Sequence, residues 1–216
     1  PHILPKHTPV PPATVPLDRI SEYCRQYGHE AKSKMDLMII GVGEQGQIGF
    51  NEPGTFSRSK TRLVQLSLNS IKTQSNFFSS FNEVPKMAIT MGIDTVMKAK
   101  QIILMAWGED KADAIRRIVE GEVTEQTPAS FFQEHPDIEV VTDETAAACL
   151  TRYEAPWVVG PCQWSRKLIR KAVIWLCARV EKPILKLTYQ DYLQNSLVPM
   201  LDSLGKRYSQ VNIEVF

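Results

Sequence analysis

The sequence predicts an α/β protein with a mainly parallel sheet in a three-layer α/β/α sandwich, followed by a small, mostly helical C-terminal extension. Between residues 35 and 150, short apolar runs typical of strands alternate with segments of helical length. Such alternation favours a sheet that is covered on both faces. Proline and glycine interrupt the chain at residues 155–164, and helical patterns follow. We therefore place one domain at residues 1–150 and an extension or linker region at residues 151–216.

The first half of this domain supplies four predicted elements around one glycine-rich loop. A polar pattern predicts a helix at 17–32, and the continuously apolar run 35–42 predicts a buried, central strand. The loop continues to Gly54, after which residues 61–68 alternate in the manner of a half-buried strand and residues 69–81 have the length of a helix. In the second half, we expect strands at 87–91, 101–107 and 138–141 and helices at 93–98, 111–120 and 128–133.

Two helices and a strand are expected in the extension. Ser165 is a candidate cap for a helix whose apolar stripe is formed by Leu168, Ile169, Val173, Leu176 and Val180. A second helix is expected at 189–204, interrupted by Pro199 and stopped by Gly205. Residues 210–216 alternate between apolar and polar side chains, which predicts a final strand.

Composition excludes several classes of protein. A formal net charge of +1 shows no basic excess of the kind that nucleic acid or an anionic membrane surface would attract. No apolar run approaches the roughly 20 residues that a membrane-spanning helix needs. The four cysteines lie far apart and form no C-x-x-C pair, which argues against a metal site and against a disulfide framework. We expect a cytoplasmic protein.

The glycines directly after the first strand match a dinucleotide-binding fingerprint. Gly41, Gly43 and Gly46 form G-x-G-x-x-G, but the fingerprint requires a helix that opens at this point. Gly49 and Pro53 work against such a helix, and the following strand ends without an acidic residue that would bind a ribose hydroxyl. We therefore expect neither a nicotinamide nor a flavin, and no other cofactor.

The same loop, residues 41–54, remains the best candidate for a ligand site. It leaves the carboxyl end of a predicted strand, which is where open α/β sheets bind ligands. Its glycines allow backbone N–H groups to approach a ligand closely, and Asn51 and Glu52 supply polar groups beside Phe50. The alternative is a connecting loop that needs glycine only for its turns.

The string GVGEQGQIGFNEPG at 41–54 resembles the signature of the glucosamine-6-phosphate deaminase/isomerase family, which is close to G-x-G-x-D-G-H-I-A-F-N-E-P. The resemblance continues through SKTR at 59–62, NFF at 76–78 and two longer segments at 84–108 and 119–136, and it covers about residues 20–150. It implies a three-layer α/β/α fold and the conversion of glucosamine 6-phosphate to fructose 6-phosphate and ammonia. It also implies that the chain lacks the amino-terminal half of that domain.

Three catalytic positions follow from this resemblance. The aspartate and histidine of the family signature fall on Gln45 and Gln47, whereas Glu52 keeps the glutamate of N-E-P. A glutamine amide donates and accepts hydrogen bonds but exchanges no proton near neutral pH. Since losing one positioned acid or base costs roughly 10²- to 10⁴-fold in rate, we expect weakened or lost catalysis.

The resemblance also implies a phosphate site. Lys111 matches the lysine that holds the substrate phosphate, near the start of a predicted helix, and Gly43 belongs to the glycine loop beside the substrate. The arginine that the family places before F-F is Asn76 here, which exchanges a charged fork for a neutral amide.

Three functions remain open at this stage, and the residues leave open whether the chain is an enzyme. The chain can be part of an amino-sugar-phosphate deaminase/isomerase, a non-catalytic sugar-phosphate sensor, or a structural or oligomerisation domain of a larger fusion protein. Residues 151–216 resemble the region that follows the deaminase-like domain in longer bacterial proteins fused to a de-N-acetylase domain. The expected partners are therefore a sugar phosphate, a fused or neighbouring de-N-acetylase, and a further copy of the chain in a homo-oligomer.

Overall fold

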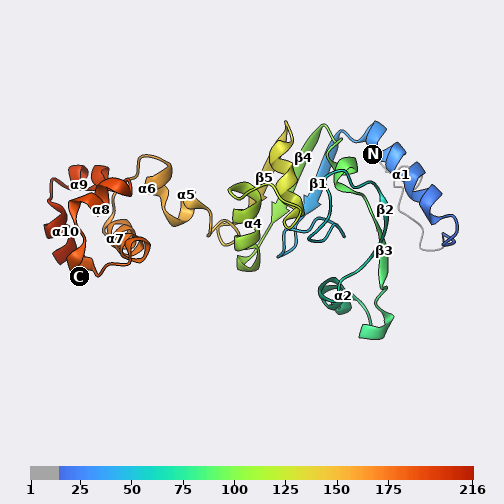
Figure 1. Cartoon of the computed structure of the whole chain (residues 1–216), viewed down its shortest axis with the longest axis horizontal. Helices are drawn as coiled ribbons and strands as arrows, with labels where there is room; N and C mark the ends of the chain where they lie inside the picture. Colours follow the sequence, from blue (N-terminus) through green and yellow to red (C-terminus); the bar gives the residue numbers. More distant parts are fainter. Residues whose placement is uncertain (1–14) are drawn as a thin grey trace, which may run out of the picture. The chain divides into compact units, whose positions relative to one another are not determined.

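The computed structural model describes residues 15–216, except for the side chains of residues 32–34 (Figure 1). Its largest sheet is built around β4 (Gln101–Ala106), whose residues alternate between half-buried and buried. β4 pairs in parallel with β1 (Leu37–Gly41) on one side and with β5 (Ile138–Thr142) on the other. This parallel sheet with its accompanying helices, followed by a helical C-terminal region, confirms the predicted fold class.

The predicted strand at 35–42 is present as β1, but its predicted central position is wrong. Among the strands that the structure describes, β1 lies at an edge of the sheet, and β4 takes the central place. Leu37 and Ile39, which share one face of β1, are 47% and 60% exposed, so that face is largely uncovered by the described residues. The continuous apolar run predicted burial on both faces of the strand. In the structure Met38 is the only buried residue of β1, so only the face to which it belongs is covered.

A separate antiparallel pair joins β2 (Arg62–Gln65) to β3 (Met87–Thr90), as expected from the alternating sequence. Between these strands the chain forms α2 (Leu68–Gln74) and two 3₁₀ turns at Ser75–Phe77 and Phe81–Glu83. Leu66, Ile71 and Val84 form a small core there. Figure 1 shows α2 beyond the end of the β2–β3 pair, away from the parallel sheet.

The remaining helices of this region flank the two sheets. α1 (Ile20–Lys34) lies against β2 and against α3 (Ile93–Val96), and α4 (Ala112–Val119) packs on the 3₁₀ segment Pro128–Glu134. A further 3₁₀ turn, Glu109–Lys111, leads directly into α4. The helix expected at 128–133 is thus present in the tighter 3₁₀ form.

The chain divides into two compact units between Ala148 and Cys149. The second unit is entirely helical and contains α5 (Thr151–Glu154), α6 (Pro156–Val159), α7 (Arg166–Val180), the 3₁₀ turn Ile184–Lys186, α8 (Tyr189–Gln194), α9 (Val198–Leu204) and α10 (Tyr208–Val215). No helix within residues 15–216 combines the length and the apolar character needed to cross a membrane.

α7 organises the core of this second unit. The Ser165 side chain caps it by accepting a hydrogen bond from the Leu168 N–H at 3.2 Å, as predicted. Val173 and Leu176 from the expected stripe are fully buried, and the Trp157 ring packs edge to face on Trp175 with centroids 5.4 Å apart. The apolar periodicity of this helix was therefore sufficient to identify its buried face.

The strand predicted at 210–216 is wrong, because this segment forms α10. Val211 and Val215 are four residues apart and therefore share one face of a helix, whereas Ile213 between them is 70% exposed. Asn212 is buried, accepts a 2.6 Å hydrogen bond from the Tyr192 hydroxyl, and donates one of 3.0 Å to the Leu187 carbonyl. These tertiary contacts override the alternating pattern.

The helix expected at 189–204 is two helices. Ser196 adopts a positive φ of 60° between α8 and α9, and the Leu197 N–H bonds back to the Tyr192 carbonyl at 3.0 Å. The break therefore comes before Pro199, which lies in the first turn of α9, where proline is tolerated. Gly205 ends α9 in the left-handed conformation, as its position predicted.

Candidate functional site

The loop that follows β1 closes on itself through backbone hydrogen bonds. The Gly43 N–H donates to the Gln47 carbonyl and the Gly46 N–H to the Gly43 carbonyl, both at 2.9 Å. Gly46 has a φ of 75°, a backbone conformation that residues other than glycine rarely adopt. No helix begins within residues 41–54, so the dinucleotide fingerprint lacks its structural context.

Gln47 folds its side chain back over the start of this loop. Its Oε1 accepts a hydrogen bond from the Gln45 N–H at 2.9 Å. A Cβ atom on Gly43 would lie 2.2 Å from the Gln47 side-chain amide, so glycine at position 43 makes room for it. The structure therefore brings together Gly43, Gln45 and Gln47, three of the predicted site residues, with a neutral amide at their centre.

Lys111 lies next to this loop, on the segment that leads into α4. Its Nζ is 3.9 Å from Glu44 Oε1 and contacts the Asp110 carboxylate, and only 19% of its side chain is exposed. The hydrogen bond from Lys111 lowers the pKa of the Asp110 carboxyl. A cation at this place is available to an anionic ligand that competes with these two carboxylates.

Arg117, which sequence reasoning missed, holds the loop against α4. Its Nη2 donates to the Glu44 carbonyl and its Nη1 to Thr127 Oγ1, both at 3.0 Å, while Nε donates to Asp113 at 2.8 Å. Only the spacing of Asp113 and Arg117 by four residues on one helix was visible in the sequence. The link to Glu44 spans 73 positions and carries no local signal.

Glu52 makes its contacts at the amino end of α2. Its carboxylate accepts hydrogen bonds from the Ser67 N–H at 3.2 Å, from the Ser67 hydroxyl at 2.9 Å and from the Ser70 hydroxyl. A carboxylate is favoured there because the helix dipole is positive at that end. Ser67 and Ser70 were also missed, although a serine directly before a helix is a recognisable cap.

An open depression of about 540 Å³ lies beside Glu52. Arg62 lines it from β2, together with Phe50, Phe56 and Ser59. The Arg62 guanidinium is fixed by a 3.0 Å hydrogen bond to Asn51 Oδ1, and burial lowers its pKa. Glu52 and Arg62 thus offer opposite charges to a polar ligand in one depression.

Asn76 lies apart from the loop after β1 and from Glu52. It is exposed on the 3₁₀ turn Ser75–Phe77 that follows α2, and no hydrogen bond or ion pair between described residues joins it to the loop. The predicted residues therefore form a first group, Gly43, Gln45 and Gln47 with Lys111 beside them, and a second position at Glu52. No hydrogen bond within residues 15–216 connects Glu52 with Gln45 or Gln47.

The donor set of the loop determines what chemistry it supports. Within residues 15–216, no cluster of histidine, cysteine, aspartate and glutamate has the geometry to hold a metal ion. Around Gly43, the site offers backbone N–H groups, the side-chain amides of Gln45 and Gln47 and the neighbouring Lys111, which bind anions and hydroxyl groups, together with the Glu44 carboxylate near Lys111. The Gln45 and Gln47 amides exchange no proton near neutral pH, so Glu44 and Glu52 are the acidic groups that residues 41–54 contain.

Comparison with protein families finds one match over most of the first unit. The family described as glucosamine-6-phosphate isomerases/6-phosphogluconolactonase matches residues 3–142. A glucosamine-6-phosphate deaminase-like protein of Bacteroides thetaiotaomicron is 43% identical over 208 residues, which is 95% of this chain and 31% of that protein. This similarity therefore continues well into the helical second unit, past the region that the family describes.

Deaminases that are shorter than the Bacteroides protein match somewhat more than half of this chain. The glucosamine-6-phosphate deaminase of Lactobacillus johnsonii is 51% identical over 120 residues, covering 56% of this chain and 50% of that enzyme. A solved monomeric glucosamine-6-phosphate deaminase aligns with a TM-score of 0.58 and 39% identity over 60% of this chain and 54% of that one. The chain thus spans about a third of the Bacteroides protein and about half of these deaminases.

Proposed function

Because the chain belongs to the glucosamine-6-phosphate isomerase/6-phosphogluconolactonase family, we propose that its first unit binds an amino-sugar phosphate and has weakened or lost the ability to deaminate it. One observation carries this proposal. Gln47 stands at the position where the family signature has its histidine. Its side-chain amide accepts a hydrogen bond from the Gln45 N–H. A side chain engaged in this way supports the shape of the loop without moving a proton.

The binding part of the proposal rests on Lys111 and on the loop backbone. Lys111 lies mostly buried next to Glu44, at the start of α4, where the positive end of the helix dipole adds to its charge. Arg117 holds Glu44 in place by donating a hydrogen bond to the Glu44 backbone carbonyl. Glu52 and Arg62 would contact the polar groups of the sugar from the neighbouring depression.

The test is a thermal-shift titration of the whole chain with glucosamine 6-phosphate, N-acetylglucosamine 6-phosphate and fructose 6-phosphate, alongside an assay for ammonia release. At about a hundred times the Kd, binding stabilises the folded state by about 2.7 kcal/mol. We expect Lys111→Ala to remove most of this stabilisation, because the phosphate loses its cation. Lys100→Ala is the matched control, since Lys100 is 80% exposed and pairs with Asp36.

The three possible outcomes separate the candidate functions. Stabilisation without ammonia release indicates a sugar-phosphate sensor, and stabilisation with ammonia release indicates a working deaminase/isomerase. An absence of stabilisation by all three ligands contradicts the proposal and leaves the structural or oligomerisation function. Equal losses in Lys111→Ala and Lys100→Ala would contradict the assignment of Lys111.

A de-N-acetylase, fused or neighbouring, is the partner that we propose for this site. Removal of an acetyl group from an N-acetylated amino-sugar phosphate yields the free amine, so such an enzyme would supply the ligand. This chain covers only 31% of the Bacteroides relative, so that protein has room for a further domain, and the de-N-acetylase is our proposal for it. The four cysteines are free thiols, in keeping with the cytoplasmic location that we propose. In the titration, this partnership requires that glucosamine 6-phosphate stabilise the chain more than its N-acetylated form does.

A further inference from the structure

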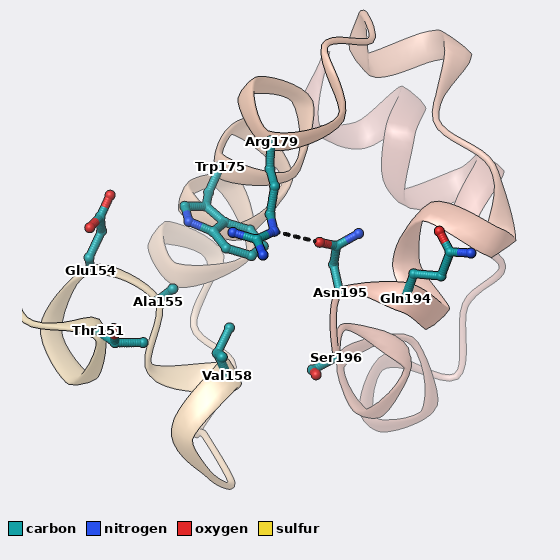
Figure 2. Close-up of a pocket in the computed structure, with 9 residues that line it drawn as sticks. All are labelled: Thr151, Glu154, Ala155, Val158, Trp175, Arg179, Gln194, Asn195 and Ser196. Carbon is teal, nitrogen blue, oxygen red and sulfur yellow. Dashed lines mark hydrogen bonds between the residues drawn. The ribbon is translucent and has the colours of Figure 1, made fainter. Parts of the chain in front are cut away.

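The helical second unit contains a pocket of its own, with a volume of about 450 Å³. This volume falls in the range of small-molecule sites. Figure 2 shows α5 and α6 on one side and the end of α8 with the following turn on the other. Nine residues line it: Thr151, Glu154, Ala155, Val158, Trp175, Arg179, Gln194, Asn195 and Ser196.

Arg179 lies at the centre of this pocket and is held from two directions (Figure 2). Its guanidinium carbon is 5.2 Å from the centroid of the Trp175 ring, a contact that is attractive between a cation and an aromatic face. Its Nε donates a 2.9 Å hydrogen bond to Asn195 Oδ1. Both contacts fix the plane of the guanidinium before any ligand arrives.

The partner of Arg179 is itself anchored. Asn195 Nδ2 donates to the Asp191 carbonyl at 2.8 Å, so its Oδ1 is turned toward the arginine. Ser196 follows in the left-handed conformation at the end of α8, and the Leu197 N–H closes that turn on the Tyr192 carbonyl at 3.0 Å. Hydrogen bonds within the unit therefore hold this wall of the pocket together.

The terminal nitrogens of Arg179 have no acidic partner among residues 15–216, since no ion pair of the described chain includes this residue. The neighbouring wall is neutral and polar, with Gln194 and Ser196 beside Asn195. A fixed guanidinium with free terminal nitrogens is suited to an oxyanion, because its two parallel N–H groups match a carboxylate or phosphate edge.

We propose that this pocket binds a small polar molecule through a phosphate or carboxylate group, with Arg179 as its anchor and Gln194 and Ser196 as contacts to its hydroxyl or amide groups. This second site is independent of the loop after β1. Glu154 is the only acid in the lining, so removing its charge by Glu154→Gln should strengthen oxyanion binding at this site.

Labelling of arginine side chains with phenylglyoxal, mapped by peptide mass spectrometry on the whole native chain, tests the proposal directly. Inorganic phosphate, glycerol 3-phosphate and malonate serve as separate probes. At about ten times the Kd of a probe, mass action leaves roughly a tenth of the sites empty. Labelling of Arg179 should then slow roughly tenfold, while Arg170, an exposed arginine of the same helix outside the pocket, keeps its rate.

Calorimetric titrations of variants provide the second measurement, in a Lys111→Ala background that removes the proposed phosphate cation of the first unit. Arg179→Lys should weaken binding of the effective probe by roughly tenfold or more, because an ammonium cannot form the two parallel hydrogen bonds. Arg170→Lys should leave the affinity unchanged. Circular dichroism of each variant verifies that the helical unit stays folded.

Protection by the two phosphates identifies a phosphate site, and protection by malonate identifies a carboxylate site. Either result supports the proposal. The proposal is overturned if no probe slows labelling of Arg179 up to about 10 mM, a concentration roughly tenfold above the upper end of typical KM values. Equal slowing at Arg170, or unchanged affinity in Arg179→Lys, overturns it as well.

Discussion

Gly43 and Gln47 show at the scale of single residues how the loop after β1 keeps its shape. The Gln47 side chain lies against the Cα of Gly43 so closely that a Cβ atom there would be 2.2 Å away. The same side chain accepts the Gln45 N–H. The two residues are therefore coupled, and changing one alters what the other tolerates.

A double-mutant cycle measures this coupling. We expect Gly43→Ala to lower the free energy of unfolding by about 1 to 3 kcal/mol, because the new methyl group displaces the glutamine side chain. In a Gln47→Ala background the same change should cost much less, since the clashing atoms are gone. Urea unfolding of the four proteins provides the numbers, and equal costs in both backgrounds would show that the two side chains do not meet.

The residues of this site were predictable only in part. The glycine pattern and the resemblance identified Gly43, Gln45, Gln47, Glu52 and Lys111 as candidates, and the structure brings the first three together. Their partners were not predictable, because sequence spacing carries no information about contacts between distant segments. Glu44 is anchored by an arginine 73 positions away, and Glu52 by Ser67 and Ser70 at the amino end of α2; both contacts depend on the tertiary fold.

At the scale of elements, α8 depends on a buried capping arrangement. The Asp191 carboxylate accepts hydrogen bonds from the Thr188 N–H at 2.7 Å and from its hydroxyl at 2.8 Å, and it pairs with Lys182 at 2.7 Å. The hydrogen bond from Lys182 is the largest cause that lowers the pKa of Asp191, and the bonds from Thr188 add to it. The charged form of Asp191 thus stabilises the start of this helix.

This arrangement predicts a pH dependence. A lowered pKa in the folded state means that the stabilisation is complete above the unfolded value of about 3.9 and is lost as the pH falls below it. Asp191→Asn should lower the free energy of unfolding by about 1 kcal/mol at pH 7, and the difference should shrink below about pH 4.

Urea unfolding at pH 7 and pH 3 checks this, with Asp202→Asn on α9 as the matched control. A constant difference between Asp191→Asn and the parent at both pH values would mean that the carboxylate charge has no part in the cap.

Most elements were predictable, and the exceptions share a cause. Strands at 87–91, 101–107 and 138–141 and the helix that Ser165 caps follow from local periodicity. The final segment does not, because Val211 and Val215 fit a strand pattern and a helix pattern equally well. The buried contacts of Asn212 decide between the two, and a local pattern does not contain them.

At the scale of the whole molecule, the two units have separate cores. The second unit buries Tyr192, Leu176 and Met200 in a cluster made only of residues from 149 onward. We expect the units to open independently. Asp191→Asn should therefore speed hydrogen exchange in peptides from 149–216 and leave peptides from 87–142 unchanged. Hydrogen exchange with mass spectrometry measures this, and equal acceleration in both regions would contradict independent opening.

The central proposal is that the first unit binds an amino-sugar phosphate, while Gln45 and Gln47 replace two of the family's proton-transfer groups. The most direct measurement is ammonia release by the whole chain at a glucosamine 6-phosphate concentration that saturates binding, with binding recorded by calorimetry on the same sample. We predict saturable binding with ammonia release at least roughly 10²-fold slower than that of an active deaminase assayed in parallel, since one lost acid or base alone costs roughly 10²- to 10⁴-fold. Ammonia release at the rate of that active deaminase would contradict the proposal and show that Gln45 and Gln47 permit full turnover.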